Sequence, residues 1–190
     1  IQEVADQSLL RQTRRAWHAR IARTLERRFP ELLRSEPEAV ARHCDEGDLV
    51  EEAATYYERA ADRAAERSAN LEAIAHLRRA IEVLERLPEG RSRNQRELRL
   101  QAALAAPLVA TTGWGSAEAE RAYARALALD EAATDDVQRF QLIRHVITFH
   151  VSRAELQTAR ALCPRLHEIA EHEQESSLRL LAHQQEAIVL

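Results

Sequence analysis

Residues 70–85 read NLEAIAHLRRAIEVLE, and this stretch decides the fold class. Its large apolar residues recur every three or four positions, and charged residues fill most of the positions between them. The apolar positions are Leu71, Ile74, Leu77, Ile81 and Leu84. Because an α-helix turns once in 3.6 residues, this spacing predicts a helix with one apolar face. The turn-forming sequence Pro88-Glu89-Gly90 is expected to end it.

Similar spacing predicts eight further helices, and no segment reads as a strand. The first helix is expected to end at Phe29. Five others should span about 37–44, 49–66, 94–111, 135–151 and 154–172. Two more should begin at Ser116 and near Ser176. Pro30 should close the first helix, and Pro107 should kink the fifth or start a new turn. The Ser116 side chain should cap the sixth. The composition agrees, because aromatic residues make up only 4% of the chain while the helix formers Ala, Leu, Arg and Glu abound.

Four of these helices share a packing pattern: an Ala, a large residue four positions later, and a small residue three positions after that. The sets are Ala53-Tyr57-Ala60, Ala73-Leu77-Ala80, Ala119-Tyr123-Ala126 and, in relaxed form, Ala159-Cys163-Leu166. Each follows a predicted turn, where stacked hairpins need small residues so that neighbouring helices can approach. A further match at Ala110-Trp114-Ala117 straddles two glycines and is treated as accidental.

The pattern predicts an all-α fold of antiparallel helical hairpins, stacked as a tetratricopeptide-like right-handed α-solenoid. The leading alanines of successive sets lie 20, 46 and 40 residues apart, against about 34 in a regular tetratricopeptide array. The first interval is too short for a whole repeat. The helix at 49–66 is therefore expected to be shared between two hairpins.

Several segments resemble one known group of proteins. Near the start these are Ile1-Gln2-Glu3-Val4-Ala5, Ser8-Leu9-Leu10, Arg14-Arg15, His18 and Ile21-Ala22. They resemble the join between the winged-helix end of a bacterial signal-transduction ATPase module and its helical repeats. Residues 67–74 (RSANLEAI), 120–123 (ERAY) and 155–160 (ELQTAR) resemble the tetratricopeptide-like region of the same proteins. Many of those proteins also carry a class III adenylate or guanylate cyclase domain.

The resemblance implies that residues 1–12 end a preceding winged-helix-like domain and that residues 13–190 form a helical-repeat domain truncated at its C-terminus. It also implies that ATP binding and cyclase chemistry belong to other parts of the parent protein. Two positions depart from the family pattern: Asp6 stands where an aromatic residue is usual, and Arg153-Ala154 where the turn usually carries Gly. The first departure weakens the expected packing at the join, and the second makes the turn after the seventh predicted helix less certain.

The composition excludes several classes of function. All 27 basic residues are Arg, so this segment has no lysine for a phosphate-binding loop or a Schiff base. The net charge is −4, which argues against a nucleic-acid partner. No apolar run is long enough to span a membrane. Cys44 and Cys163 are far apart in sequence, and free thiols fit a cytoplasmic location.

Two histidine motifs are weighed as metal sites and set aside. His167 and His172 are five residues apart, so on one helix their rings point about 140° apart and cannot share an ion. His43-Cys44-Asp45 offers three metal-capable side chains, but consecutive helical residues point in different directions. We expect ordinary surface histidines and a small half-buried thiol, with no catalytic, cofactor or metal site.

Three further features keep more than one interpretation. His150 and Arg144 contact a ligand if their helix faces the groove of the solenoid; otherwise His150 is a core histidine with satisfied hydrogen bonds. Gly113-Trp114-Gly115 is either a packed turn or an aromatic binding loop. The first helix carries Trp17, Ile21, Leu25 and Phe29 at four-residue spacing among many arginines. Those arginines form a solvated face, a docking face for the preceding domain, or a DNA contact.

The sequence as a whole predicts a non-enzymatic interaction segment of a larger bacterial signalling protein, an ATPase with a nucleotide cyclase. Its partner is expected to be a protein, a peptide or a neighbouring domain of the same chain, with no nucleic acid, membrane or small-molecule substrate. The alternative is the effector-sensing repeat region of an ATPase-type transcriptional regulator.

Overall fold

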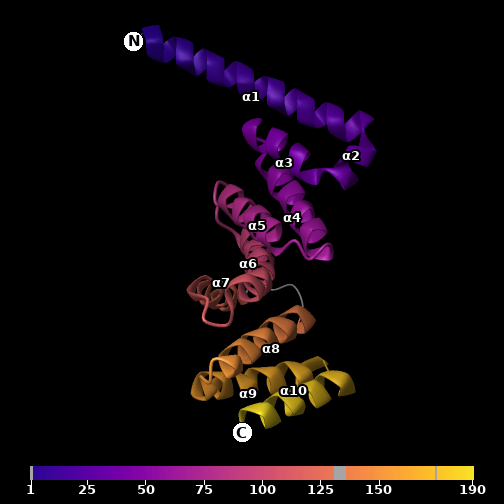
Figure 1. Ribbon diagram of the computed structural model, residues 1–190, viewed down its shortest axis with the longest axis vertical. Coiled ribbons are helices and arrows are strands. Elements are labelled where there is room, and N and C mark those ends of the chain that lie inside the picture. The colour runs from indigo at the N-terminus through magenta and orange to yellow at the C-terminus, as the bar shows by residue number, and fades with distance from the viewer. Residues whose placement is uncertain (1, 131–135, 174) are drawn as a thin grey trace. The chain divides into compact units, whose positions relative to one another are not determined.

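The chain is all-helical in the computed structural model, which describes residues 2–130, 136–173 and 175–190 (Figure 1). Those ranges contain ten helices and no strand. The chain divides into two compact units, Ile1–Glu89 and Gly90–Leu190. The turn predicted at Pro88-Glu89-Gly90 therefore coincides with the boundary between them.

The first unit is built from consecutive helices that pack on one another. Its helices are α1 (Gln2–Arg28), α2 (Pro30–Ser35), α3 (Pro37–Glu46), α4 (Val50–Glu66) and α5 (Asn70–Leu84). The most extensive contacts join α4 to α5 and α3 to α4, and α1 rests on α3 and α2. The buried face of α4 holds two tyrosines and five alanines. Small side chains there let the backbones of neighbouring helices come close.

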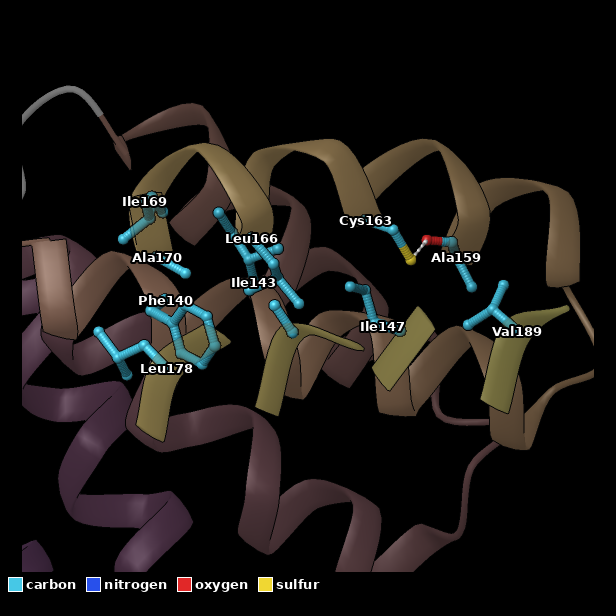
Figure 2. Close-up of a cluster of buried hydrophobic side chains, with 11 residues drawn as sticks. Phe140, Ile143, Ile147, Ala159, Cys163, Leu166, Ile169, Ala170, Leu178 and Val189 are labelled. Carbon is cyan, nitrogen blue, oxygen red and sulfur yellow. Dashed lines mark hydrogen bonds between the residues drawn. The ribbon is translucent and has the colours of Figure 1, made fainter. Parts of the chain in front are cut away.

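The second unit has the same consecutive arrangement. Its helices are α6 (Arg91–Thr112), α7 (Ala117–Ala128), α8 (Asp136–Ser152), α9 (Leu156–Glu173) and α10 (Ser176–Val189). α6 packs on α7, and α9 packs on both α8 and α10. Figure 2 shows the core that holds the last three helices together, with Phe140, Leu166 and Val189 among its fully buried members.

The packing pattern found in the sequence coincides with buried positions. All twelve residues of the four sets are buried, on α4, α5, α7 and α9. The match treated as accidental is different, because Ala110, Trp114 and Ala117 are all exposed. Placement after a turn thus separated true packing sites from a chance match in an alanine-rich chain.

The first helix and its neighbour differ from expectation. Pro30 does not only close α1; it also begins α2, a helix of six residues that was missed in the sequence. None of those six residues is buried, so no apolar periodicity marks them. The predicted stripe on α1 also faces largely outward, with Trp17 58% and Phe29 49% exposed.

Small residues make the contact between α1 and α3. Ala22 is fully buried, and Gly47, at the C-terminal end of α3, lies against the backbone of Ala19. A β-carbon placed on Gly47 would sit 2.6 Å from the amide nitrogen of Ala19. This position therefore requires glycine because of space, at an ordinary negative φ.

Helix ends and prolines follow the expected chemistry in part. The Ser116 side chain accepts a hydrogen bond from the Ala119 amide at 3.2 Å, which confirms the predicted cap of α7. α6 continues through Pro107 as one helix to Thr112. The hydroxyl of Thr111 donates to the Pro107 carbonyl at 2.9 Å.

The turn between α8 and α9 places Ala154 at φ 59°, in the left-handed region that favours glycine. The Glu155 amide donates to the His150 carbonyl at 2.9 Å across the turn. Arg153 Nε also donates to Glu155 Oε1 at 2.7 Å. These bonds hold a conformation that an alanine side chain disfavours.

None of the helices formed by the described residues is both long and apolar enough for a bilayer crossing.

Candidate binding groove

A cavity of about 530 Å³ lies among α6, α7 and α8 of the second unit. Its lining residues are Leu98, Arg99, Ala102, Ala103, Ala106, Tyr123, Gln138, Gln141, Leu142 and His145. The volume falls within the range of about 300–1,000 Å³ that is usual for ligand sites. Three alanines on two adjacent turns of α6 leave the space that larger side chains would fill. We call this cavity the α6–α8 groove.

The floor of the α6–α8 groove is apolar and firmly packed. Leu98 and Leu142 are buried in the core beneath it. Tyr123 is also buried, its ring lies 5.2 Å from that of Phe149, and burial raises the pKa of its hydroxyl. A floor made from side chains of three helices changes shape only if the helices move.

The polar groups of the groove include several hydrogen-bond donors. Arg144 lies outside the lining and donates to Gln141 Oε1 from Nε at 3.2 Å and Nη2 at 2.8 Å. The Gln141 carbonyl oxygen is thereby engaged, which leaves its amide group as a donor. Burial and, secondarily, the charge of Arg144 lower the pKa of His145, so its imidazole is neutral near pH 7. Arg99 adds an exposed positive charge.

The lining residues include no carboxylate, thiol, serine or threonine. Arg99 and the amide groups beside an apolar floor are suited to holding an apolar group next to a carboxylate.

The two histidines of α8 differ in their relation to the groove. His145 lines it, whereas His150 Nδ1 lies 2.6 Å from Oε2 of Glu155 and its ring contacts Phe149 edge-on. His150 is therefore the half-buried, hydrogen-bonded histidine that was the second interpretation. Arg144 lies outside the lining and contacts it through Gln141.

The three consecutive metal-capable residues of α3 lie in different surroundings. His43 Nδ1 lies 3.0 Å from Nδ1 of His18 on α1. Cys44 is fully buried, whereas the sequence predicted a half-buried thiol. Asp45 is buried and accepts hydrogen bonds from Arg79 Nη2 at 2.6 Å and Arg86 Nη1 at 2.7 Å. Asp45 thus joins α3 to α5 and to the residues that follow α5.

The basic face of α1 makes contacts within the first unit. Arg15 pairs with Asp48 at 3.5 Å, and the guanidinium of Arg20 lies 5.7 Å from the centre of the Trp17 ring. A second cavity of about 570 Å³ follows the exposed stripe from Leu10 to Ile21. All its lining residues come from α1, so it is a shallow surface along one helix.

Trp114 belongs to a partly packed turn. Its ring lies 6.2 Å from that of Phe149, and its carbonyl accepts a hydrogen bond from Arg153 at 3.4 Å. The indole remains 44% exposed.

The comparisons with known proteins add no relative: a scan against protein-family models and searches of curated proteins and of solved structures found no match to this chain.

Proposed function

We propose that this chain is a non-catalytic, helical-repeat interaction segment whose α6–α8 groove binds a peptide segment bearing an apolar side chain and a carboxylate. The observation that carries the proposal is the lining: an apolar floor with donor groups and no acidic side chain. An acidic group on the partner complements Arg99 and the donor groups beside it. The peptide belongs to another protein or to a neighbouring domain of the same parent chain.

The wider setting rests on the sequence resemblance. We propose a larger bacterial signalling protein, an ATPase fused to a nucleotide cyclase, in which stacked tetratricopeptide-like hairpins form a cytoplasmic right-handed solenoid. Occupancy of the groove then changes the packing of α6 against α8, which alters the positions of the domains attached to the repeat.

A second candidate function uses the same cavity. Its volume also suits a small molecule, as expected for the effector-sensing region of an ATPase-type transcriptional regulator. The two proposals differ in the ligand and share the site.

The experiment selects peptides by display on the 190-residue chain and measures their affinities by fluorescence anisotropy. Ala106 lines the groove and is exposed, so Ala106→Trp fills the groove without burying a large side chain in the core. We expect it to weaken binding at least tenfold. Arg99→Glu should do the same for peptides that contain a carboxylate.

The matched control is Ala124→Trp, at an exposed position of α7 outside the groove. It should leave affinity unchanged. Equal affinities for the Ala106→Trp variant and the parent chain would rule out the groove as the binding site. Failure to select any peptide, together with a thermal shift produced by a small anionic metabolite pool, would favour the effector-sensing alternative.

A further inference from the structure

Three metal-capable side chains converge where α9 packs on α10. They are His167 on α9 and His183 and Glu186 on α10, and one potential ligand atom from each lies within 4.8 Å of the other two. His167 Nε2 is 3.0 Å from Glu186 Oε2, and His183 Nδ1 is 3.9 Å from the same oxygen. The two imidazole rings are 4.8 Å apart between centres. We call these residues the α9–α10 cluster.

We propose that the α9–α10 cluster binds one zinc ion or a similar divalent transition metal. Two imidazoles and one carboxylate form a ligand set that zinc commonly takes, with one coordination position left for water or for a partner's side chain. Zinc–ligand bonds of 2.0–2.1 Å in a tetrahedron place the ligand atoms about 3.4 Å apart. The separations of 3.0 and 3.9 Å bracket that value, so small side-chain rotations complete the site.

The helices beneath the cluster have a fixed register. Leu166 and Ala182, the neighbours of the two histidines, are buried in the shared core. Arg160, on the first half of α9, donates to the carbonyl of Val189 at 3.2 Å, at the last turn of α10. The backbone positions of the three ligands are therefore set before any metal binds. Binding then costs less conformational entropy, because only the side chains become ordered.

An ordinary surface ion pair explains the arrangement less well. Glu186 needs only His167 to form such a pair, yet His183 also approaches the same carboxylate oxygen. Two protonated imidazoles at this separation repel each other, whereas two neutral ones can share a cation. Their convergence on one point is what a metal centre requires.

His172 does not join His167 as a pair; it contacts Asp136 of α8 at 2.8 Å. Asp136, His172 and Glu173 form another group of possible ligands. In that group Asp136 is also bound by Arg139 at 3.0 Å, so its carboxylate is partly neutralised. In the α9–α10 cluster, the carboxylate of Glu186 lies against two imidazoles.

The test titrates Zn²⁺ into the untagged 190-residue chain by calorimetry and follows Co²⁺ by visible absorption. We expect one equivalent to bind, a tetrahedral Co²⁺ spectrum without a thiolate band, and a higher Tm in the presence of metal. His183 is 71% exposed on its side chain, so His183→Ala leaves the fold intact and should weaken binding at least tenfold. Glu186→Gln should weaken it in the same direction.

His172→Ala and Cys163→Ser are the controls, and both should bind as the parent chain does. Loss of binding in His172→Ala but not in His183→Ala would move the metal to the other group and overturn the proposal. A thiolate-to-cobalt band that disappears in Cys163→Ser would overturn the three-ligand set. Peptide binding at the α6–α8 groove is measured separately, so neither proposal depends on the other.

Discussion

Arg125 on α7 holds Glu97 on α6 through two parallel hydrogen bonds. Nε donates to Oε1 at 2.6 Å and Nη2 donates to Oε2 at 3.0 Å. The two partners are unequally buried: the carboxylate side chain is 8% exposed and the guanidinium side chain 48%. The carboxylate therefore depends on this contact, whereas the guanidinium can also be solvated by water.

Replacing each partner should have unequal effects. Arg125→Met leaves a buried carboxylate without its main partner and should lower the free energy of unfolding by about 3–5 kcal/mol. Glu97→Gln leaves a cation that water can reach and should cost about 1–2 kcal/mol. Urea unfolding followed by circular dichroism measures both. A larger loss in Glu97→Gln would contradict the proposed asymmetry.

Gly47→Ala should loosen α1 from α3. The new methyl group meets backbone atoms of Ala19 and His43, which cannot rotate away as a side chain would. Overpacking of this kind typically costs about 1–3 kcal/mol. Gly115→Ala is the control, because a β-carbon there has no neighbour within 4 Å. Comparable losses in the two variants would remove the steric explanation.

Ala154→Gly should stabilise the protein. Glycine adopts the observed φ of 59° without the side-chain clash that alanine has, and the expected gain is about 0.5–1 kcal/mol. Ala161→Gly, at an exposed position within α9, should instead cost about 1 kcal/mol. Thermal unfolding of the two variants distinguishes a turn effect from a general effect of glycine.

The junction of α1 with α3 should weaken in acid. Burial lowers the pKa of His43, the charges of His18 and Arg42 lower it further, and Glu46 opposes them. In the unfolded chain the pKa is near the ordinary value of about 6.5. Between that value and the lower folded pKa, the unfolded state binds the proton and the folded state does not. Stability is therefore full above about pH 6.5 and falls as the pH is lowered.

His43→Gln checks this prediction. Between pH 7 and 5 its free energy of unfolding should fall less steeply than that of the parent chain, as measured by urea unfolding at each pH. Parallel slopes would show that His43 does not contribute to the pH dependence.

The thiols should be inert in the folded protein. Burial, followed by the charges of Glu26 and Glu52, raises the pKa of Cys44 to about 12. At pH 8 about one molecule in ten thousand then carries the thiolate, the form that reacts. Burial likewise raises the pKa of Cys163. Ellman's reagent should detect no thiol in the native chain and two in guanidinium, and fast labelling of the native chain would contradict this.

Local patterns predicted much of the fold. Helix positions follow from apolar spacing, and the packing sets follow from alanines that come just after turns. The same reasoning was less accurate where burial was partial. Leu71 belongs to the clearest stripe in the sequence yet is 75% exposed, because Ala73 and Ala80 take the buried positions of α5. Apolar character gives the face of a helix only approximately when alanine is the main core residue.

Contacts between residues far apart in the sequence were not predictable in the same way, and the candidate sites depend on such contacts. Glu97 and Arg125 are separated by 28 positions, and His167 and Glu186 by 19. Such pairs depend on which helices pack together and in what register, and helical periodicity within one segment does not contain that information. The i, i+3 spacing of His183 and Glu186 was the one local signal, and it gains meaning only beside His167.

Gly47 fits directly against the backbone of Ala19, and α1 extends well beyond this contact towards its N-terminus. Residues 10–17 of α1 are all exposed, and within this stretch Arg15 pairs with Asp48 at 3.5 Å. From Gln2 to Ala19 the helix extends about 25 Å. A displacement of that end of α1 bears over this length on the Gly47 contact, where a β-carbon would lie 2.6 Å from the amide nitrogen of Ala19.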